Sequence, residues 1–284
     1  VFGERHPLVG ASLNHMGVLC REQGRYVEAV EYTERALRIR EETLGELHPD
    51  LAASLNNLAN LHMMQGHYDR ATPLYERTLR LLENLLGDRH PDVAVALNNL
   101  ANVCSEQGDY INAEPLYERA LRLREEILGD QHPEVATSLN NLAGLYRSEG
   151  RFVQAESFYI RALQLREVAF GERHPHVADS LNSLAILYKM QGSYDKALPL
   201  YTRALRIREE VLGSNHPDTG IACNNLGTLC MEQGRFEEAE ALLNRALSVF
   251  TGMLSADHPY SIKVRETLQE LHSKLEHPTD GDQA

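Results

Sequence analysis

The dipeptide His-Pro recurs every 42 residues along the chain, and this period constrains the fold more than any other feature of the sequence. Seven copies follow this period with no insertion between them, at His6, His48, His90, His132, His174, His216 and His258. A fixed period of this length is typical of stacked units, each of which contacts mainly its neighbours. The sequence therefore predicts a repeat architecture with a core that runs along the stack.

Each unit predicts two helices. After His-Pro, about 17 residues carry apolar side chains at helical spacing, such as Val93 and Leu97. The dipeptide Gln107-Gly108 ends this first helix, because Gly adopts positive φ at little cost. A second helix is expected over residues 110–128. The expected fold class is all-α, a right-handed superhelical α-solenoid of helix-turn-helix repeats.

The seven His residues lie where the cap of each first helix belongs. Pro at the first helical position gives up an N–H that would be unpaired anyway, and Asp50 or Asp92 behind it complements the helix dipole. Metal binding is the alternative interpretation, because imidazole is a common ligand. Ligands must meet within a few ångströms, however, whereas these His residues are one repeat apart. We expect a capping role and no metal site.

Nothing in the chain predicts catalysis. It has no phosphate loop, dinucleotide glycine signature, metalloprotease helix or Gly-flanked nucleophile. We therefore expect no enzyme activity and no cofactor. The net charge of −13 opposes binding to nucleic acid and to anionic membranes, and no run of 18 apolar residues could cross a bilayer.

An Arg column in the second helices is the one basic feature. It consists of Arg35, Arg77, Arg119, Arg161, Arg203 and Arg245. A stripe that follows phosphates is one interpretation. Because Glu76 and Glu118 precede an Arg by four residues on the same helices, we favour a solvated outer face with internal ion pairs.

The four cysteines predict a reducing environment. Cys20, Cys104 and Cys230 occupy one repeat column, so they lie too far apart for disulfides, and Cys223 precedes Cys230 by seven residues. We expect free core thiols in a cytoplasmic protein.

The expected domain organisation follows the period. Residues 1–5 would be the tail of a preceding repeat helix, 258–276 a C-terminal capping helix and 277–284 a disordered tail. Between them, residues 6–254 would form six units, at about 6–47, 48–89, 90–131, 132–173, 174–215 and 216–257. Because residues 1–7 match residues 169–175 closely, we expect the chain to be a segment of a longer protein.

The repeat resembles a known family. Leu58-Ala59, Gly66, Tyr68, Ala71 and Tyr75 place small and large residues in the order of a tetratricopeptide repeat (TPR). The string HPDVAVALNNLANVCSEQGDYINAEPLYERALRLREEILG and its 42-residue spacing resemble the TPR domain of kinesin light chains and of nephrocystin-like and bacterial TPR proteins. The resemblance implies a concave groove lined by first helices, which in kinesin light chains accepts short cargo peptides in extended conformation.

An Asn column in the first helices is the candidate site. It consists of Asn14, Asn56, Asn98, Asn140, Asn182 and Asn224, with a looser column of His15, Asn57, Asn99, Asn141, Ser183 and Asn225 beside it. Asn is a mediocre helix former, so its repetition in mid-helix indicates that the amide is needed. The resemblance assigns peptide contact to the first column. The alternative is that neighbouring Asn residues bond one another and stiffen the stack.

Residues three or four positions further along would share the groove. Those that we place in the peptide-binding groove are Asn60, Asn102, Met63, Arg147 and Lys189. The expected function is a protein-interaction adaptor that binds an extended peptide of a partner, within a kinesin-like or other multidomain context outside this segment. The alternatives are a rigid spacer or oligomerisation scaffold within a larger signalling protein, and a module that clasps a chaperone tail. The last is disfavoured because such modules generally carry Lys or Arg where this chain has Asn14 and Asn56.

Overall fold

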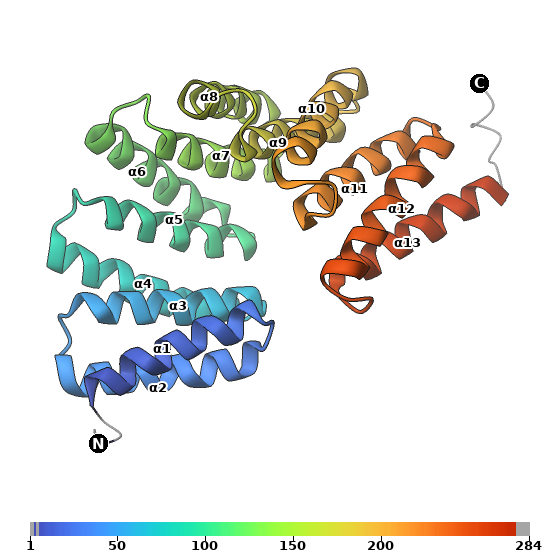
Figure 1. Cartoon of the computed structure of the whole chain (residues 1–284). Helices are drawn as coiled ribbons and strands as arrows, with labels where there is room; N and C mark the ends of the chain where they lie inside the picture. Colours follow the sequence, from blue (N-terminus) through green and yellow to red (C-terminus); the bar gives the residue numbers. More distant parts are fainter. Residues whose placement is uncertain (1–2, 4–5, 277–284) are drawn as a thin grey trace. The chain divides into compact units, whose positions relative to one another are not determined.

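Thirteen α-helices form the part of the chain that the computed structural model describes, which is Gly3 and residues 6–276 (Figure 1). Their bounds are α1 Pro7–Glu22, α2 Tyr26–Leu44, α3 Pro49–Met64, α4 Tyr68–Leu86, α5 Pro91–Glu106, α6 Tyr110–Leu128, α7 Pro133–Ser148, α8 Phe152–Phe170, α9 Pro175–Met190, α10 Tyr194–Leu212, α11 Pro217–Glu232, α12 Phe236–Met253 and α13 Pro259–Glu276. No strand occurs among the described residues. The expected all-α fold of helix-turn-helix units is confirmed. The expected tails at 1–5 and 277–284 lie outside the described residues, apart from Gly3.

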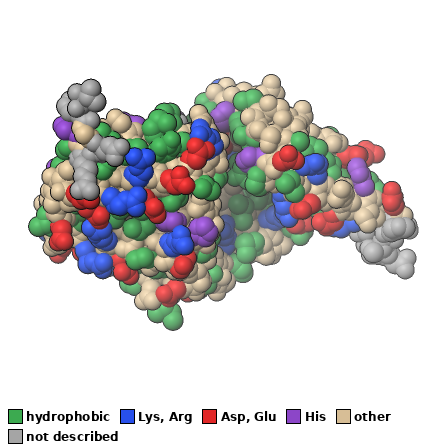
Figure 2. All heavy atoms as spheres, turned by 90° about the horizontal axis from the view of Figure 1, so that it is seen from below, with side chains coloured by type: hydrophobic (Ala, Val, Ile, Leu, Met, Phe, Trp, Pro, Cys, Tyr) green, Lys and Arg blue, Asp and Glu red, His purple; other side chains and the backbone are tan. Residues whose placement is uncertain are grey.

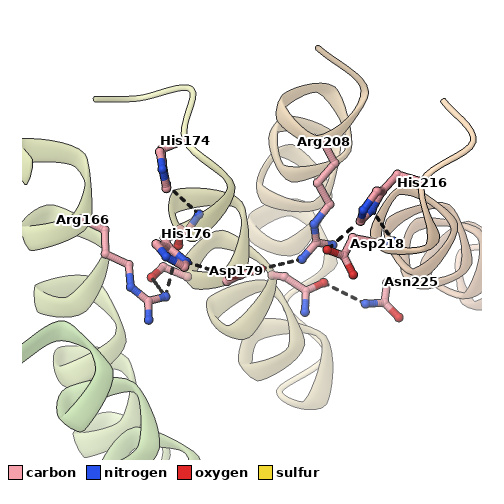
Figure 3. Close-up of polar contacts among 10 residues, drawn as sticks. Arg166, His174, His176, Asp179, Arg208, His216, Asp218 and Asn225 are labelled. Atoms are coloured by element: carbon pink, nitrogen blue, oxygen red, sulfur yellow. Dashed lines mark hydrogen bonds and ion pairs between the residues drawn. The ribbon is translucent and has the colours of Figure 1, made fainter. Parts of the chain in front are cut away.

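The first helix of each repeat begins at the Pro of the His-Pro dipeptide. In all seven dipeptides the His Nδ1 accepts a hydrogen bond from the backbone N–H two residues on, as from Asp50 to His48 at 3.1 Å. Figure 3 shows this cap at His174 and at His216. One otherwise unpaired N–H of each helix is thereby satisfied. The capping role expected for the His residues is confirmed.

A left-handed glycine follows the first helix of each of the six helical hairpins. Gly108 has φ of 76°, which lets the N–H groups of Gly108 and Asp109 turn back to the carbonyls of Ser105 and Cys104, at 3.0 and 2.9 Å. A side chain at Gly108 would strain this conformation. The turn leads directly into α6, so the two helices of a repeat run antiparallel.

The chain divides into two compact units, unit 1 at residues 1–145 and unit 2 at residues 146–284, with the division inside α7. In unit 1 each of the helices α1 to α6 packs on the next, and in unit 2 the same holds for α8 to α13. Each unit is therefore a run of stacked helical hairpins, as expected for a solenoid. The finer boundaries expected for six 42-residue repeats stay a prediction.

Small residues in the second helices allow close packing against the first helices. Ala71, Ala113, Ala155 and Ala197 have no exposed surface. One turn further on, a Tyr fills the space beside each of them, and each of these Tyr side chains is at least 96% buried: Tyr75, Tyr117, Tyr159 and Tyr201. This alternation of small and large residues builds a continuous apolar core along each unit.

The outer Arg column pairs with the preceding repeat. The ion pairs are Arg77–Glu41 at 2.6 Å, Arg119–Glu83 at 2.8 Å, Arg203–Glu167 at 2.7 Å and Arg245–Glu209 at 2.5 Å. The same-helix pairs Glu76–Arg80 and Glu118–Arg122 also form. Acidic and basic side chains lie interspersed on the face drawn in Figure 2. The expected internal pairing is confirmed for these four of the six column residues, with a Glu partner on the preceding repeat and not on the same helix.

The four cysteines are free and buried. Burial raises the pKa of the Cys104, Cys223 and Cys230 thiols, which keeps them protonated and unreactive. No helix within the described residues has both the length and the apolar character that a membrane span requires. Nowhere in residues 6–276 do three His, Cys, Asp or Glu side chains gather as metal ligands would.

Candidate functional site

The first Asn column and the second Asn column bond to each other across repeats. The Nδ2 group of the second-column residue donates to Oδ1 of the first-column residue in the preceding repeat. The bonds are Asn57 to Asn14 at 3.3 Å, Asn99 to Asn56 at 2.9 Å, Asn141 to Asn98 at 2.8 Å and Asn225 to Asn182 at 2.8 Å, the last drawn in Figure 3. We call this set of bonds the Asn ladder. It ties the first helix of one repeat to the first helix of the next.

The ladder fixes the orientation of four first-column amides, those of Asn14, Asn56, Asn98 and Asn182. In Asn56 and Asn98 the Oδ1 atom is occupied, whereas the Nδ2 group makes no hydrogen bond to another described residue. Asn56 is half-buried and Asn98 is 7% exposed. The acceptor is thus used inside the protein, and the two amide donors remain for other partners.

The ladder stops where the second column departs from Asn. The Oδ1 atoms of Asn140 and Asn224 are buried without a hydrogen-bond partner. One repeat after each of these residues, the sequence places Ser183 and Thr267 where the ladder has the donating Asn. The hydroxyl of Thr267 donates instead to the Lys263 carbonyl of its own helix, at 3.0 Å.

Asn60 and Asn102 are held by tyrosines of their own repeats. Tyr75 Oη donates to Asn60 Oδ1 at 2.5 Å, and Tyr117 Oη donates to Asn102 Oδ1 at 2.6 Å. Burial raises the pKa of Tyr75 to about 12, so the hydroxyl stays a donor over the whole physiological range. These two amides are therefore oriented like those of Asn56 and Asn98: the carbonyl oxygen accepts a hydrogen bond within the protein.

The remaining candidates of unit 1 and unit 2 have different surroundings. Met63 is half-buried on α3. In unit 2, Lys189 Nζ lies 3.0 Å from Glu232 Oε1 and donates to Thr228 Oγ1 at 3.4 Å. Arg147 is half-buried on α7. Burial raises the pKa of Tyr159 and of Tyr201, and the positive charge of Arg147 partly lowers both pKa values.

A cavity of about 310 Å³ surrounds Lys189. Its lining includes Ile186, Tyr201, Asn225 and Glu232. Ile186 occupies the repeat position of Asn60, so the Tyr201 hydroxyl has no amide carbonyl to bind and makes no hydrogen bond to another described residue. The structure thus brings Lys189 together with residues that come from α9, α10 and α11.

A buried Arg–Ser pair, which the sequence analysis did not identify, joins successive repeats. Arg40 donates to Ser54 at 2.5 Å, Arg124 donates to Ser138, and Arg166 donates to Ser180 at 2.9 Å. The Arg side chains are at most 9% exposed. The signal is present in the sequence as Arg followed by Ser after 14 residues, but a charged residue in a repeat is more easily assigned to the surface.

The Arg–Ser pair is replaced in the other repeats. Leu82 and Ala96 stand in its place between α4 and α5, and Phe250 and Val264 stand there between α12 and α13. Arg208 is followed by Ala222, which cannot accept a hydrogen bond, so its Nη1 atom is buried without a partner. Its Nη2 atom donates to Asp179 Oδ1 at 2.9 Å, and Figure 3 shows these two side chains facing each other.

The tetratricopeptide repeat family matches the chain in overlapping stretches, at residues 8–84, 50–126, 92–167, 134–210 and 190–252. A comparison with curated proteins finds no match. Among solved structures, the crystal structure of BtubC (BKLC) from P. vanneervenii is 28% identical with a TM-score of 0.62, over 84% of this chain and 93% of that chain.

Two further solved structures share the fold at lower identity. A kinesin light chain-like protein of Podospora anserina with nearly identical TPR-like repeats is 24% identical with a TM-score of 0.61, over 72% of this chain and 97% of that chain. The apo form of RapI is 16% identical with a TM-score of 0.60, over 92% of this chain and 99% of that chain.

Proposed function

Because the chain belongs to the tetratricopeptide repeat family, a fold that generally mediates protein–protein interaction, we propose that it is an adaptor module that binds an extended segment of a partner protein. The binding surface would be the face of the first helices that carries the first Asn column. The observation that carries this proposal is the Asn ladder, which occupies the amide carbonyls of Asn56 and Asn98 and leaves their amide donors available.

Oriented amides suit a ligand in extended conformation. A backbone carbonyl of an extended peptide can accept from an Asn Nδ2 group whatever its side chains are, so a row of such donors holds a strand with little regard to sequence. Because the ladder already fixes the amides, binding costs less side-chain entropy. Asn60 and Asn102, oriented by Tyr75 and Tyr117, extend the same row in this proposal.

The groove would include the remaining candidates as flanking contacts. Met63 would offer a flexible apolar surface, and Arg147 and Lys189 would offer positive charge. We propose no catalytic activity and no cofactor. Four of the six outer Arg side chains pair with Glu, which disfavours a basic stripe for phosphates and therefore a nucleic-acid partner. The buried free thiols favour a reducing compartment such as the cytoplasm.

A rigid spacer or scaffold within a larger protein is the second candidate function. The observation that favours it is the same ladder, because hydrogen bonds that span repeats stiffen a stack even without a ligand. The two functions differ in which amide atom matters. A spacer needs only the carbonyl of each first-column Asn, whereas an adaptor also needs the N–H groups.

The test is the double substitution Asn56→Asp with Asn98→Asp. A carboxylate still accepts from Asn99 and Asn141, so the ladder survives, but the amide donors are lost. Each lost ligand bond costs on the order of 1 kcal/mol, which predicts a several-fold loss of affinity per site. The measurement is binding to pools of synthetic 12-residue peptides by fluorescence polarisation, with thermal melts in parallel.

The matched control is Asn84→Asp with Asn215→Asp, which adds the same charge at two exposed positions. We expect the control to bind the pools as the unsubstituted chain does. If the Asn56 and Asn98 double variant binds every pool as tightly as the control and melts normally, the adaptor function is wrong. That result would support the spacer function.

A further inference from the structure

An apolar pocket lies where unit 1 lacks the buried Arg–Ser pair. It has a volume of about 340 Å³ and is lined on one side by Leu82, Leu85 and Leu86 of α4 and by Ala96 of α5. In the neighbouring repeats Arg40 and Arg124 reach across to Ser54 and Ser138 at the corresponding place. Leu82 is shorter than an Arg, and Ala96 is smaller than a Ser.

The volume is not simply a result of apolar replacement. At the junction between α12 and α13, where both members of the pair are also replaced by apolar residues, Phe250 and Val264 are each 1% exposed and fill the corresponding space. Leu82 by contrast is only partly buried, and it packs from one side against the core cluster that contains Leu55 and Leu58. The pocket therefore exists because this junction has the smallest pair of side chains.

The pocket opens on the face that carries the first Asn column. Asn56 itself lines it, together with Ala53 one turn before Asn56 and Val95 one turn before Asn98. Residues three positions apart share a face of a helix. Val95 is 44% exposed, which is unusual for a Val in a first helix of this chain and places an apolar rim beside the oriented amides.

The charge at the mouth of the pocket is negative. Asp92 lines it with 62% of its side chain exposed, Asp50 follows the lining residue Pro49, and no Lys or Arg is among the lining residues. A volume near the lower end of the ~300–1,000 Å³ of ligand sites suits one large side chain better than a whole small molecule. An apolar side chain would be stabilised by burial against the apolar lining, and a neighbouring basic residue would be attracted by the carboxylate of Asp92.

We propose that this pocket is the specificity site of the groove and that it takes a large apolar side chain, such as Leu or Phe, next to a basic residue in the bound segment. This inference rests on the proposed peptide-binding function. The Asn amides hold the backbone of the segment, and the pocket between α3, α4 and α5 selects its sequence.

The test variant is Leu82→Arg with Ala96→Ser, which installs the pair that the neighbouring repeats already carry and fills the pocket. The probe is a set of synthetic 12-residue peptide pools with one fixed central residue, Leu, Phe, Ser or Asp, flanked by either Lys or Glu. We expect the unsubstituted chain to prefer Leu or Phe pools with Lys flanks over Ser pools by roughly tenfold. The double variant should lose this preference and keep its weak binding to all pools.

Two variants of exposed residues keep the test valid if the double variant folds poorly. Val95→Lys should weaken binding to the Lys-flanked pools, and Asp92→Asn should abolish the preference for Lys over Glu flanks. If Leu82→Arg with Ala96→Ser melts normally and retains the Leu and Phe preference, the pocket proposal is wrong while the groove proposal stands. If Asn56→Asp with Asn98→Asp changes no pool, the groove proposal fails and the pocket proposal with it.

A second copy of the chain is the competing occupant. Sedimentation velocity on the same proteins distinguishes it from a peptide segment. We expect the same mass with and without the pocket substitutions. A dimer that Leu82→Arg with Ala96→Ser converts to a monomer would assign the pocket to self-association and overturn the proposal.

Discussion

Unit 1 and unit 2 fill the same repeat positions differently. In unit 1 the Arg–Ser and Tyr–Asn pairs are complete, as in Tyr75 with Asn60 and Arg124 with Ser138, except where Leu82 and Ala96 replace both members of one pair. In unit 2 two pairs have lost one member: Ala222 stands at the Ser position that belongs to Arg208, and Ile186 stands at the Asn position that belongs to Tyr201. The two residues of a pair together therefore determine whether a junction between repeats is hydrogen-bonded, apolar or left with an unpaired polar atom.

Three outcomes of this pairing are visible on one scaffold. A complete Arg–Ser pair joins two repeats with hydrogen bonds. Replacement of both members by apolar residues leaves a pocket at Leu82 and Ala96 and a filled core at Phe250 and Val264. Replacement of the Ser alone leaves a buried guanidinium N–H without an acceptor, as at Arg208.

The largest effect is expected when unit 1 is made to resemble unit 2. Ser138→Ala would leave Arg124 as Arg208 is now, with a buried donor that has lost its acceptor. We expect unfolding free energy to fall by about 2 kcal/mol, because a buried unsatisfied group costs about 1–3 kcal/mol. Urea denaturation measures this, with Ser273→Ala at an exposed position of α13 as the control. An unchanged midpoint would mean that the Arg124–Ser138 bond contributes nothing to stability.

The reverse change should stabilise unit 2 by a smaller amount. Ala222→Ser supplies the hydroxyl that Arg208 Nη1 lacks, in the arrangement seen for Arg166 and Ser180. We expect a gain of about 1 kcal/mol, the usual net value of one hydrogen bond. The control is Ala222→Ser in a chain that also carries Arg208→Met, where the added hydroxyl has no guanidinium to bind. A gain of equal size in that background would contradict the assignment.

The smallest effect on stability is expected from removal of a single tyrosine hydroxyl, at Tyr75 in unit 1 or at Tyr201 in unit 2. Tyr75→Phe removes the bond to Asn60 and should cost about 1 kcal/mol, whereas Tyr201→Phe removes a hydroxyl that bonds no described residue and should cost less than about 0.5 kcal/mol. Paired thermal melts of the two variants measure the difference. Equal costs would show that Tyr201 has a partner of similar strength, such as an ordered water.

The sequence predicts the local structure of this chain well. The period, the His-Pro caps and the Gly turns each act within a few residues, so the second helix expected at 110–128 is observed as Tyr110–Leu128. The expected kinesin light chain-like TPR fold is confirmed by the family match and by the similar solved structures.

Contacts between repeats could be predicted only in part. Which face of one helix meets the next depends on packing, so spacing alone does not pair Asn99 with Asn56 or Arg119 with Glu83. The same limit explains why the Arg–Ser pair and the Leu82–Ala96 pocket were missed. A 14-residue interval from one helix to the next becomes informative only when the two helices are seen together.

The most direct test of the proposed groove is an NMR measurement on the side-chain amides. With ¹⁵N-labelled protein, the Nδ2 signals of Asn56 and Asn98 are followed while a Leu-centred, Lys-flanked 12-residue peptide pool is added, with exposed Asn84 as the internal reference. If the groove holds an extended segment through these donors, both signals shift in proportion to occupancy and the Asn84 signal stays in place. Binding that saturates without moving the Asn56 and Asn98 signals would contradict the role proposed for the first Asn column.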